Sequence, residues 1–156
     1  IYTGKDMGLL SEAGCPAIAD PGANLVRIAH EKEIQVVPLV GPSSILLALM
    51  ASGLNGQSFS FHGYLPIDRA SCIEKIIQIE SASLKLKQTQ IFIETPKQNK
   101  KLFELLIAHC QRSTHLCTAS NLTLQGEAIK TRSIKDWQTN SPDFEKKPTV
   151  FLLQRY

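Results

Sequence analysis

The pattern of apolar and polar positions predicts alternating strands and helices in the first part of the chain. A short apolar run at 7–10 predicts a strand, and residues 22–33 carry apolar side chains at helical spacing. The β-branched run at 34–40 predicts a buried strand, and the apolar run at 45–52, closed by Gly53, predicts a helix. Alternation of this kind favours a parallel sheet with helices on its faces.

The rest of the chain predicts a second lobe with a mixed sheet. Strands are expected at 58–65, 89–95, 114–120, 127–134 and 149–156, helices at 68–87 and 97–111, and a polar connector at 135–148. Of the connections after residue 95, only the helix at 97–111 is long enough for a crossover, so the last three strands are expected to be antiparallel neighbours at a sheet edge. The fold class is therefore α/β, with residues 1–57 in an N-terminal lobe and residues 58–156 in a C-terminal lobe.

The first lobe is unusual because it holds only two predicted strands. A two-stranded open parallel sheet would leave its apolar faces and both its edges uncovered. We therefore expect this chain to be the latter part of a longer protein.

The loop "SEAGCPAIADPG" at 11–22 follows the first predicted strand, where α/β proteins bind ligands beside helix N-termini. Gly14 allows a ligand to approach the backbone, Asp20 is a candidate N-cap, and Pro21 suits the first helical position. The turn "VGPSS" repeats this arrangement after the second strand, with Ser43 as its candidate N-cap. Two interpretations stay open, a ligand loop and a well-formed helix start, although the loop is longer than a turn requires.

Composition places the chain of 156 residues among soluble globular domains, with 43% hydrophobic and 20% charged residues. Its net charge of +3 is too small to indicate nucleic-acid binding by itself. The longest apolar stretch, 45–51, is far short of the roughly 20 residues that a membrane span needs. The first residues do not resemble a secretory signal, so a cytoplasmic protein with no membrane partner is expected.

The cysteines indicate reduced thiols, because their wide spacing contains no CxxC pair. They lie at Cys15, Cys72, Cys110 and Cys117. Cys110 and Cys117 cluster with His109 and His115, but a zinc site needs converging ligands. The first pair of this cluster closes a predicted helix and the second opens a predicted strand, which favours core packing over a metal site.

Four segments in order carry a resemblance to a known family. They are "LLSEAGCPAIADPGANLVRIA", "VVPLVGPSSILLALMASGL", "FSFHGYLP" and "IFIETPKQ". They resemble the tetrapyrrole methylase superfamily of S-adenosylmethionine-dependent methyltransferases, and within it the branch of ribosomal RNA small subunit methyltransferase I. That branch reads SDAGTPxISDPG, PGPSA, a GFLP-like strand end and a YESPHR-like strand end. The resemblance covers residues 5–100 well and the remainder loosely.

The resemblance implies a two-lobe fold in which this chain holds only part of a parallel N-terminal lobe. Members of the superfamily begin with a further strand, a phosphate-loop-like turn and a helix. The chain is therefore expected to lack roughly the first third of an intact enzyme. By itself it is expected to bind the cofactor poorly, to be inactive and to self-associate.

The resemblance also implies which residues bind S-adenosylmethionine. In the first lobe these are Ala13, Gly14, Cys15 and Ile18, followed by Ser43 and Ser44 at the next helix start. In the second lobe they are Glu94, Ser120 and Asn121, which correspond to positions that close over the adenosine portion. Binding by backbone groups suits this cofactor, because its sulfonium is already electrophilic and needs neither a nucleophile nor a metal. No catalytic residue is identified, and the lone His62 is interpreted as structural rather than as a substrate contact.

The sequence departs from the branch pattern at two basic motifs. "SNLTL" stands where the branch has RELTK, and "ETPKQ" stands where it has ESPHR. Basic side chains anchor RNA phosphates, so these losses affect the substrate more than the cofactor. Lys97, Lys100 and Lys101 are candidates to compensate, although an exposed helix face shows the same pattern.

Three functional hypotheses follow. The leading one is a homodimeric methyltransferase that acts on RNA, at a ribose 2′-hydroxyl of small-subunit ribosomal RNA. The second is methylation of a tetrapyrrole-like small molecule or of a protein. The third is a non-catalytic module that binds the cofactor or RNA.

Overall fold

The computed structural model describes residues 4–156, and the chain divides between Ser43 and Ser44 into two compact units. This division lies before the predicted lobe boundary near residue 57. The helix α2 (Ser44–Ser52) accounts for the difference, because its Ala48 and Leu49 pack with side chains of the sheet in the second unit. The functional assignment of the two lobes stays a prediction.

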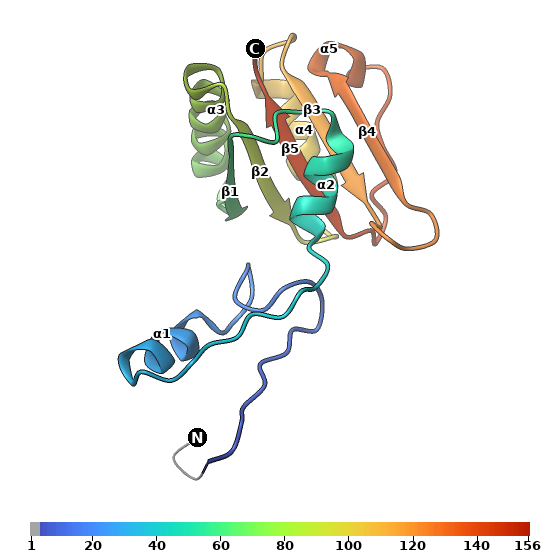
Figure 1. The fold of residues 1–156 in the computed structure, drawn as a ribbon. Helices are drawn as coiled ribbons and strands as arrows, with labels where there is room; N and C mark the ends of the chain where they lie inside the picture. The colour runs from blue at the N-terminus through green and yellow to red at the C-terminus, as the bar shows by residue number, and fades with distance from the viewer. Residues whose placement is uncertain (1–3) are drawn as a thin grey trace. The chain divides into compact units, whose positions relative to one another are not determined.

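The second unit is built on a five-stranded mixed sheet of order β1-β2-β5-β3-β4 (Figure 1). Its strands are β1 (Phe59–Tyr64), β2 (Thr89–Glu94), β3 (His115–Ser120), β4 (Ala128–Ser133) and β5 (Thr149–Gln154). β1 and β2 pair in parallel, whereas β5 pairs antiparallel with both β2 and β3, and β4 pairs antiparallel with β3. The predicted α/β class and the antiparallel arrangement of the last three strands are confirmed.

Helices cover both faces of this sheet (Figure 1). They are α2 on one face, α3 (Arg69–Leu86) and α4 (Asn99–His109) on the other, and the short α5 (Ile134–Trp137). α3 begins where its sequence predicts, because the carboxylate of Asp68 accepts hydrogen bonds from the Ser71 N–H and hydroxyl. These bonds lower the pKa of Asp68.

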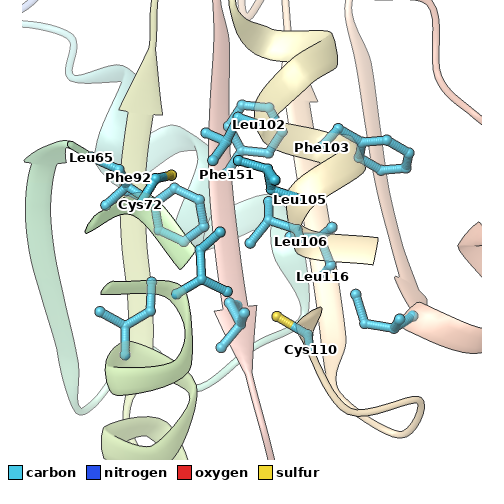
Figure 2. Close-up of a cluster of buried hydrophobic side chains, with 14 of the residues drawn as sticks. Leu65, Cys72, Phe92, Leu102, Phe103, Leu105, Leu106, Cys110, Leu116 and Phe151 are labelled. Atoms are coloured by element: carbon cyan, nitrogen blue, oxygen red, sulfur yellow. The ribbon is translucent and has the colours of Figure 1, made fainter. Parts of the chain in front are cut away.

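The main core lies between the sheet and the α3/α4 layer (Figure 2). The rings of Phe92 on β2 and Phe151 on β5 stack with centroids 5.9 Å apart and an interplanar angle of 4°. Phe103 of α4 packs edge-on against Trp137, at 5.6 Å between centroids. Each of these side chains is buried, so the core fixes α4 and α5 on the sheet.

The connector at 135–148, expected to be only polar, contributes two aromatic residues to this core. The Trp137 indole donates a hydrogen bond to the Leu116 carbonyl at 2.8 Å, and Phe144 is buried. The polar residues around them concealed this packing in the sequence pattern.

The first unit contains one helix, α1 (Ala23–Glu31), as the spacing predicts. The strands predicted at 7–10 and 34–40 are wrong, and within residues 4–43 no parallel sheet forms. A strand needs a neighbour to take its N–H and C=O groups, and no strand of the described residues pairs with these segments. Their side chains are correspondingly open, with Leu39 88% exposed.

None of the helices in residues 4–156 has the length and apolar character required to span a bilayer.

Candidate functional site

The loop before α1 has a strained backbone at its centre. Gly14, Ala17 and Ala19 have positive φ values of 75°, 65° and 54°. A left-handed conformation costs a non-glycine residue about 1–2 kcal/mol, so the surrounding loop must hold both alanines in place. The Ile18 N–H donates to the Cys15 carbonyl at 3.3 Å and closes a turn between them. Strain of this kind clusters at ligand-binding loops.

Gly14 lies at an open point of this loop. A Cβ built on Gly14 would meet no atom within 4 Å, so the backbone there is accessible to a ligand. Ala13 and Ile18 are exposed as well, and Ile18 keeps 52% of its surface. These features fit a cofactor that is held by backbone groups.

The interpretation of Asp20 and Pro21 as a helix cap is wrong. The N-cap of α1 is Gly22, with φ 139° and no side-chain capping bond. The φ of 139° is one that residues other than glycine rarely adopt, so the backbone conformation requires glycine at this cap. A Cβ there would also lie 2.6 Å from Cδ2 of Leu9, the end of a flexible side chain.

Cys15 joins the two predicted ligand loops of the first unit. Its thiol donates to the Pro42 carbonyl at 3.4 Å and lies 4.0 Å from the Gly41 carbonyl oxygen. The segment at 13–18 and the "GPSS" turn, far apart in sequence, are thus in contact. Ser43 is the last residue of the first unit, and the exposed Ser44 is the first residue of α2 in the second unit.

The second unit brings its own predicted residues to one end of the sheet. Thr149 on β5 pairs with Glu94 on β2 and with Ser120 on β3. These three residues lie in register with the alternating core positions Phe92 and Phe151, and therefore share the α3/α4 face of the sheet. The Glu94 carboxylate accepts a hydrogen bond from the N–H of the next residue, Thr95, at 2.6 Å.

Asn121 follows directly and starts a turn. Its φ is 52°, a left-handed conformation that asparagine tolerates better than most residues. Its N–H donates to the Pro148 carbonyl at 3.0 Å. The structure thus brings Glu94, Ser120 and Asn121 together at one sheet end.

Sequence reasoning did not identify Asn99, Lys147 and Thr149 at this sheet end. The hydroxyl oxygens of Ser120 and Thr149 share a hydrogen bond of 2.9 Å. The Thr149 hydroxyl donates to the Lys147 carbonyl at 3.1 Å. The Asn99 side-chain amide donates to the same carbonyl at 2.9 Å. Asn99 lies in a lysine-rich stretch, which concealed its burial. The sequence did contain one signal of this sheet end, because Thr149 is a polar residue at the start of an apolar strand, directly after Pro148.

Lys97, Lys100 and Lys101 are exposed around the first turn of α4. The ion pairs within residues 4–156 are Arg27 with Glu31 and Lys147 with Asp143, so none of these three lysines has a carboxylate partner there. The first turn of α4 contains no acidic residue. An anion would therefore meet uncompensated positive charge at this helix start.

The remaining candidates are His62 and the three buried cysteines. His62 Nε2 lies 2.6 Å from Gln90 Oε1, which ties β1 to β2.

Burial raises the pKa of the Cys72, Cys110 and Cys117 thiols. The sequence cluster of Cys110 and Cys117 with His109 and His115 is split between the end of α4 and β3. Across residues 4–156, no group of three or more His, Cys, Asp or Glu side chains is placed to hold a metal ion.

No protein-family model matches the chain. Curated relatives do match. The chain is 31% identical over 159 residues to "Ribosomal RNA small subunit methyltransferase I" of Vibrio cholerae, covering 100% of this chain and 54% of the relative. It is also 31% identical over 154 residues to the protein of the same name from Haemophilus influenzae, covering 97% of this chain and 53% of the relative. The chain therefore spans about half the length of the curated relatives it matches.

Solved structures match the fold at low sequence identity. The methyltransferase CobJ matches with a TM-score of 0.59 and 18% identity, covering 91% of this chain and 62% of that one. Uroporphyrin-III-C-methyltransferase from Thermus thermophilus matches with a TM-score of 0.53 and 20% identity, covering 90% and 60%. These structures show that the chain has the tetrapyrrole methylase fold, and along its whole length its sequence is similar to proteins named ribosomal RNA small subunit methyltransferase I.

Proposed function

We propose that the full-length protein is an S-adenosylmethionine-dependent methyltransferase that acts on RNA, at a ribose 2′-hydroxyl of small-subunit ribosomal RNA. The observation that supports this proposal is the open loop around residues 13–18, with left-handed alanines at 17 and 19, in a chain similar to proteins named as such enzymes. A loop that served only to start α1 would not need two alanines in the left-handed conformation.

The proposed cofactor-binding residues are those that the family resemblance implies. Backbone groups of Ala13, Gly14, Cys15 and Ile18 hold the cofactor, and the "GPSS" turn with Ser43 and Ser44 borders it. Glu94, Ser120 and Asn121 contact the adenosine portion. When bound, S-adenosylmethionine supplies an electrophilic methyl group on a positively charged sulfur. The task of these residues is to orient that group, exclude water and hold the acceptor in line with it.

RNA is favoured as the acceptor by charge as well as by homology. Lys97, Lys100 and Lys101 present positive charge without a carboxylate partner among residues 4–156. Such side chains bind phosphates regardless of sequence, and they replace in part the basic residues that "SNLTL" and "ETPKQ" lack. A ribose hydroxyl needs a general base, and no residue is assigned to that role.

One observation favours a second candidate, a module that binds the cofactor or RNA without catalysis. "SNLTL" lacks the arginine, glutamate and lysine of the related motif. If those side chains act on the reacting hydroxyl or its phosphates, the chain would retain binding and lose turnover. Methylation of a small molecule or of a protein is the remaining alternative.

Methyl transfer separates these candidates. The full-length gene product is incubated with tritium-labelled S-adenosylmethionine and with ribosomal RNA, total protein or a tetrapyrrole, and incorporation is counted in each. We expect label in small-subunit RNA, at a site that resists alkaline hydrolysis because its 2′-hydroxyl is methylated. Label in protein or tetrapyrrole alone would contradict the RNA assignment. Cofactor binding without transfer to any acceptor would support the non-catalytic module.

We further propose a cytoplasmic homodimer. The apolar side chains that the first unit exposes, among them Leu10 and Leu39, support association with a second copy. Light scattering on the purified full-length protein tests this. A mass of one chain across a hundredfold range of concentration would contradict it.

A further inference from the structure

A connected group of polar residues, three of them buried, lies at the end of the sheet where β2, β5 and β3 meet. We call it the strand-end network, and it consists of Asn99, Ser120, Lys147 and Thr149. Asn99, Ser120 and Thr149 are 0%, 4% and 4% exposed. The carbonyl of Lys147 accepts from both the Asn99 amide at 2.9 Å and the Thr149 hydroxyl at 3.1 Å, and Thr149 lies 2.9 Å from the Ser120 hydroxyl.

This network is polar in a place where apolar side chains would pack. Burying polar groups is unfavourable unless their hydrogen bonds are made, and one atom here lacks a partner. Oδ1 of Asn99 is buried and accepts no hydrogen bond within residues 4–156. A buried network that leaves an acceptor unpaired calls for an explanation besides packing.

The network controls the segment from Lys147 to Thr149. α4 holds this segment from one side through Asn99, and β3 holds it from the other through Ser120. The Pro148 carbonyl in the middle of the segment accepts from the Asn121 N–H at 3.0 Å. The left-handed turn at Asn121 is therefore built on a support that Asn99 and Thr149 keep in place.

We infer that Thr149 and Asn99 are positioning residues, which hold Ser120 and Asn121 in the geometry that binds S-adenosylmethionine. The inference rests on the proposed function, in which Ser120 and Asn121 contact the cofactor. Thr149 acts through its hydroxyl on Ser120, and Asn99 acts through the Lys147 carbonyl on the same segment. Neither residue needs to touch the cofactor.

The test compares isosteric variants of the full-length protein by calorimetric titration with S-adenosylmethionine, at a temperature where circular dichroism shows each variant folded. Thr149→Val keeps the shape and removes the hydroxyl, so its affinity should fall about tenfold, the effect of one buried hydrogen bond. Thr149→Ser keeps the hydroxyl and should stay within about threefold of the parent.

The matched control is Thr89→Val. Thr89 is a buried threonine at the opposite end of β2, and its single hydroxyl proton has two acceptors within reach, the Asn55 carbonyl at 2.9 Å and Gln154 Oε1 at 3.0 Å. The substitution should lower the unfolding temperature and leave cofactor affinity unchanged. An equal loss of affinity in Thr89→Val and Thr149→Val would overturn the inference, and so would an equal loss in Thr149→Ser.

A second variant, Asn99→Ala, keeps the inference testable if Thr149→Val does not fold. It removes one bond to Lys147 together with the unpaired Oδ1, so stability should change little while affinity falls several-fold. If the folded variants bind S-adenosylmethionine as tightly as the parent, the positioning role is refuted and the proposed function is not. A parent protein that does not bind S-adenosylmethionine refutes the proposed function, and the positioning role with it.

Discussion

The two units of the chain are rich in similar apolar runs, yet they use them differently. In the second unit, "TVFLLQ" becomes the central strand β5, and all six of its residues are buried. In the first unit, "IQVVPLV" at 34–40 forms no strand, and its Leu39 is 88% exposed. The difference is the neighbour, because β5 pairs on both sides and the first-unit segment pairs with no described strand. An apolar run therefore predicts that a segment can be a strand, and its pairing partners decide whether it is one.

The largest expected contrast between the units is in stability. Phe151→Ala removes a buried ring that stacks on Phe92, so the free energy of unfolding should fall by about 3–5 kcal/mol. Leu39→Ala, in the first unit, should change it by less than about 0.5 kcal/mol, since the side chain is already in solvent. Urea titration measures both. A loss above about 1 kcal/mol for Leu39→Ala would show that this segment is packed in solution and would remove the contrast.

The thiols should separate the units by reactivity. The thiolate is the nucleophile, and burial raises the pKa of the three second-unit cysteines at 72, 110 and 117, which lowers their thiolate fraction at pH 8. Cys15 in the first unit is only half-buried. Iodoacetamide should therefore label Cys15 about a hundredfold faster than the others, as read by peptide mass spectrometry. Denaturant should equalise the rates, and equal rates in the native protein would contradict the burial described.

Cofactor affinity should depend on the first-unit loop. Gly14→Val places a β-branched residue at φ 75° and fills the open space beside the loop, so affinity for S-adenosylmethionine should fall about tenfold or more. Gly53→Val is the control, because Gly53 has φ 71° and equally open surroundings at the end of α2. If calorimetry finds the parent affinity in Gly14→Val, the loop serves only to start α1 and does not hold the cofactor.

The smallest effect is expected at Cys15. Cys15→Thr keeps a donor for the Pro42 carbonyl, 3.4 Å from the thiol, so activity should stay within about threefold of the parent. A loss of more than tenfold, about 1.4 kcal/mol in transition-state stabilisation, would indicate that the thiol itself takes part.

Much of the second unit could be predicted from its sequence because its signals are local and agree with its packing. The length of α3 and the apolar strands around Phe92 and Phe151 match the structure closely. Trp137 and Phe144 could not be placed, because their burial depends on α4 and not on their polar neighbours in sequence. The roles of Thr149 and Asn99 could not be predicted for the same reason, since their hydrogen-bond partners come from other elements.

In the first unit, the sequence predicted the helix and the position of the loop. It predicted neither the backbone strain of the loop nor the residue that caps the helix. Gly22 caps α1 through its backbone conformation, with φ 139°, and makes no side-chain bond that a capping pattern would reveal. The left-handed alanines at 17 and 19 are equally hidden, since alanine normally avoids that conformation. The resemblance to the methyltransferase family indicated which loop to examine, and the structure supplied its geometry.

The central claim is that backbone groups of residues 13–18 hold S-adenosylmethionine, and amide hydrogen exchange measures those groups directly. The full-length protein is compared with and without saturating cofactor, and peptides are resolved by mass spectrometry. We predict slower exchange within 13–18 on binding, with no change in β4 at the far edge of the sheet. Binding confirmed by calorimetry, with unchanged exchange at 13–18, would contradict the account.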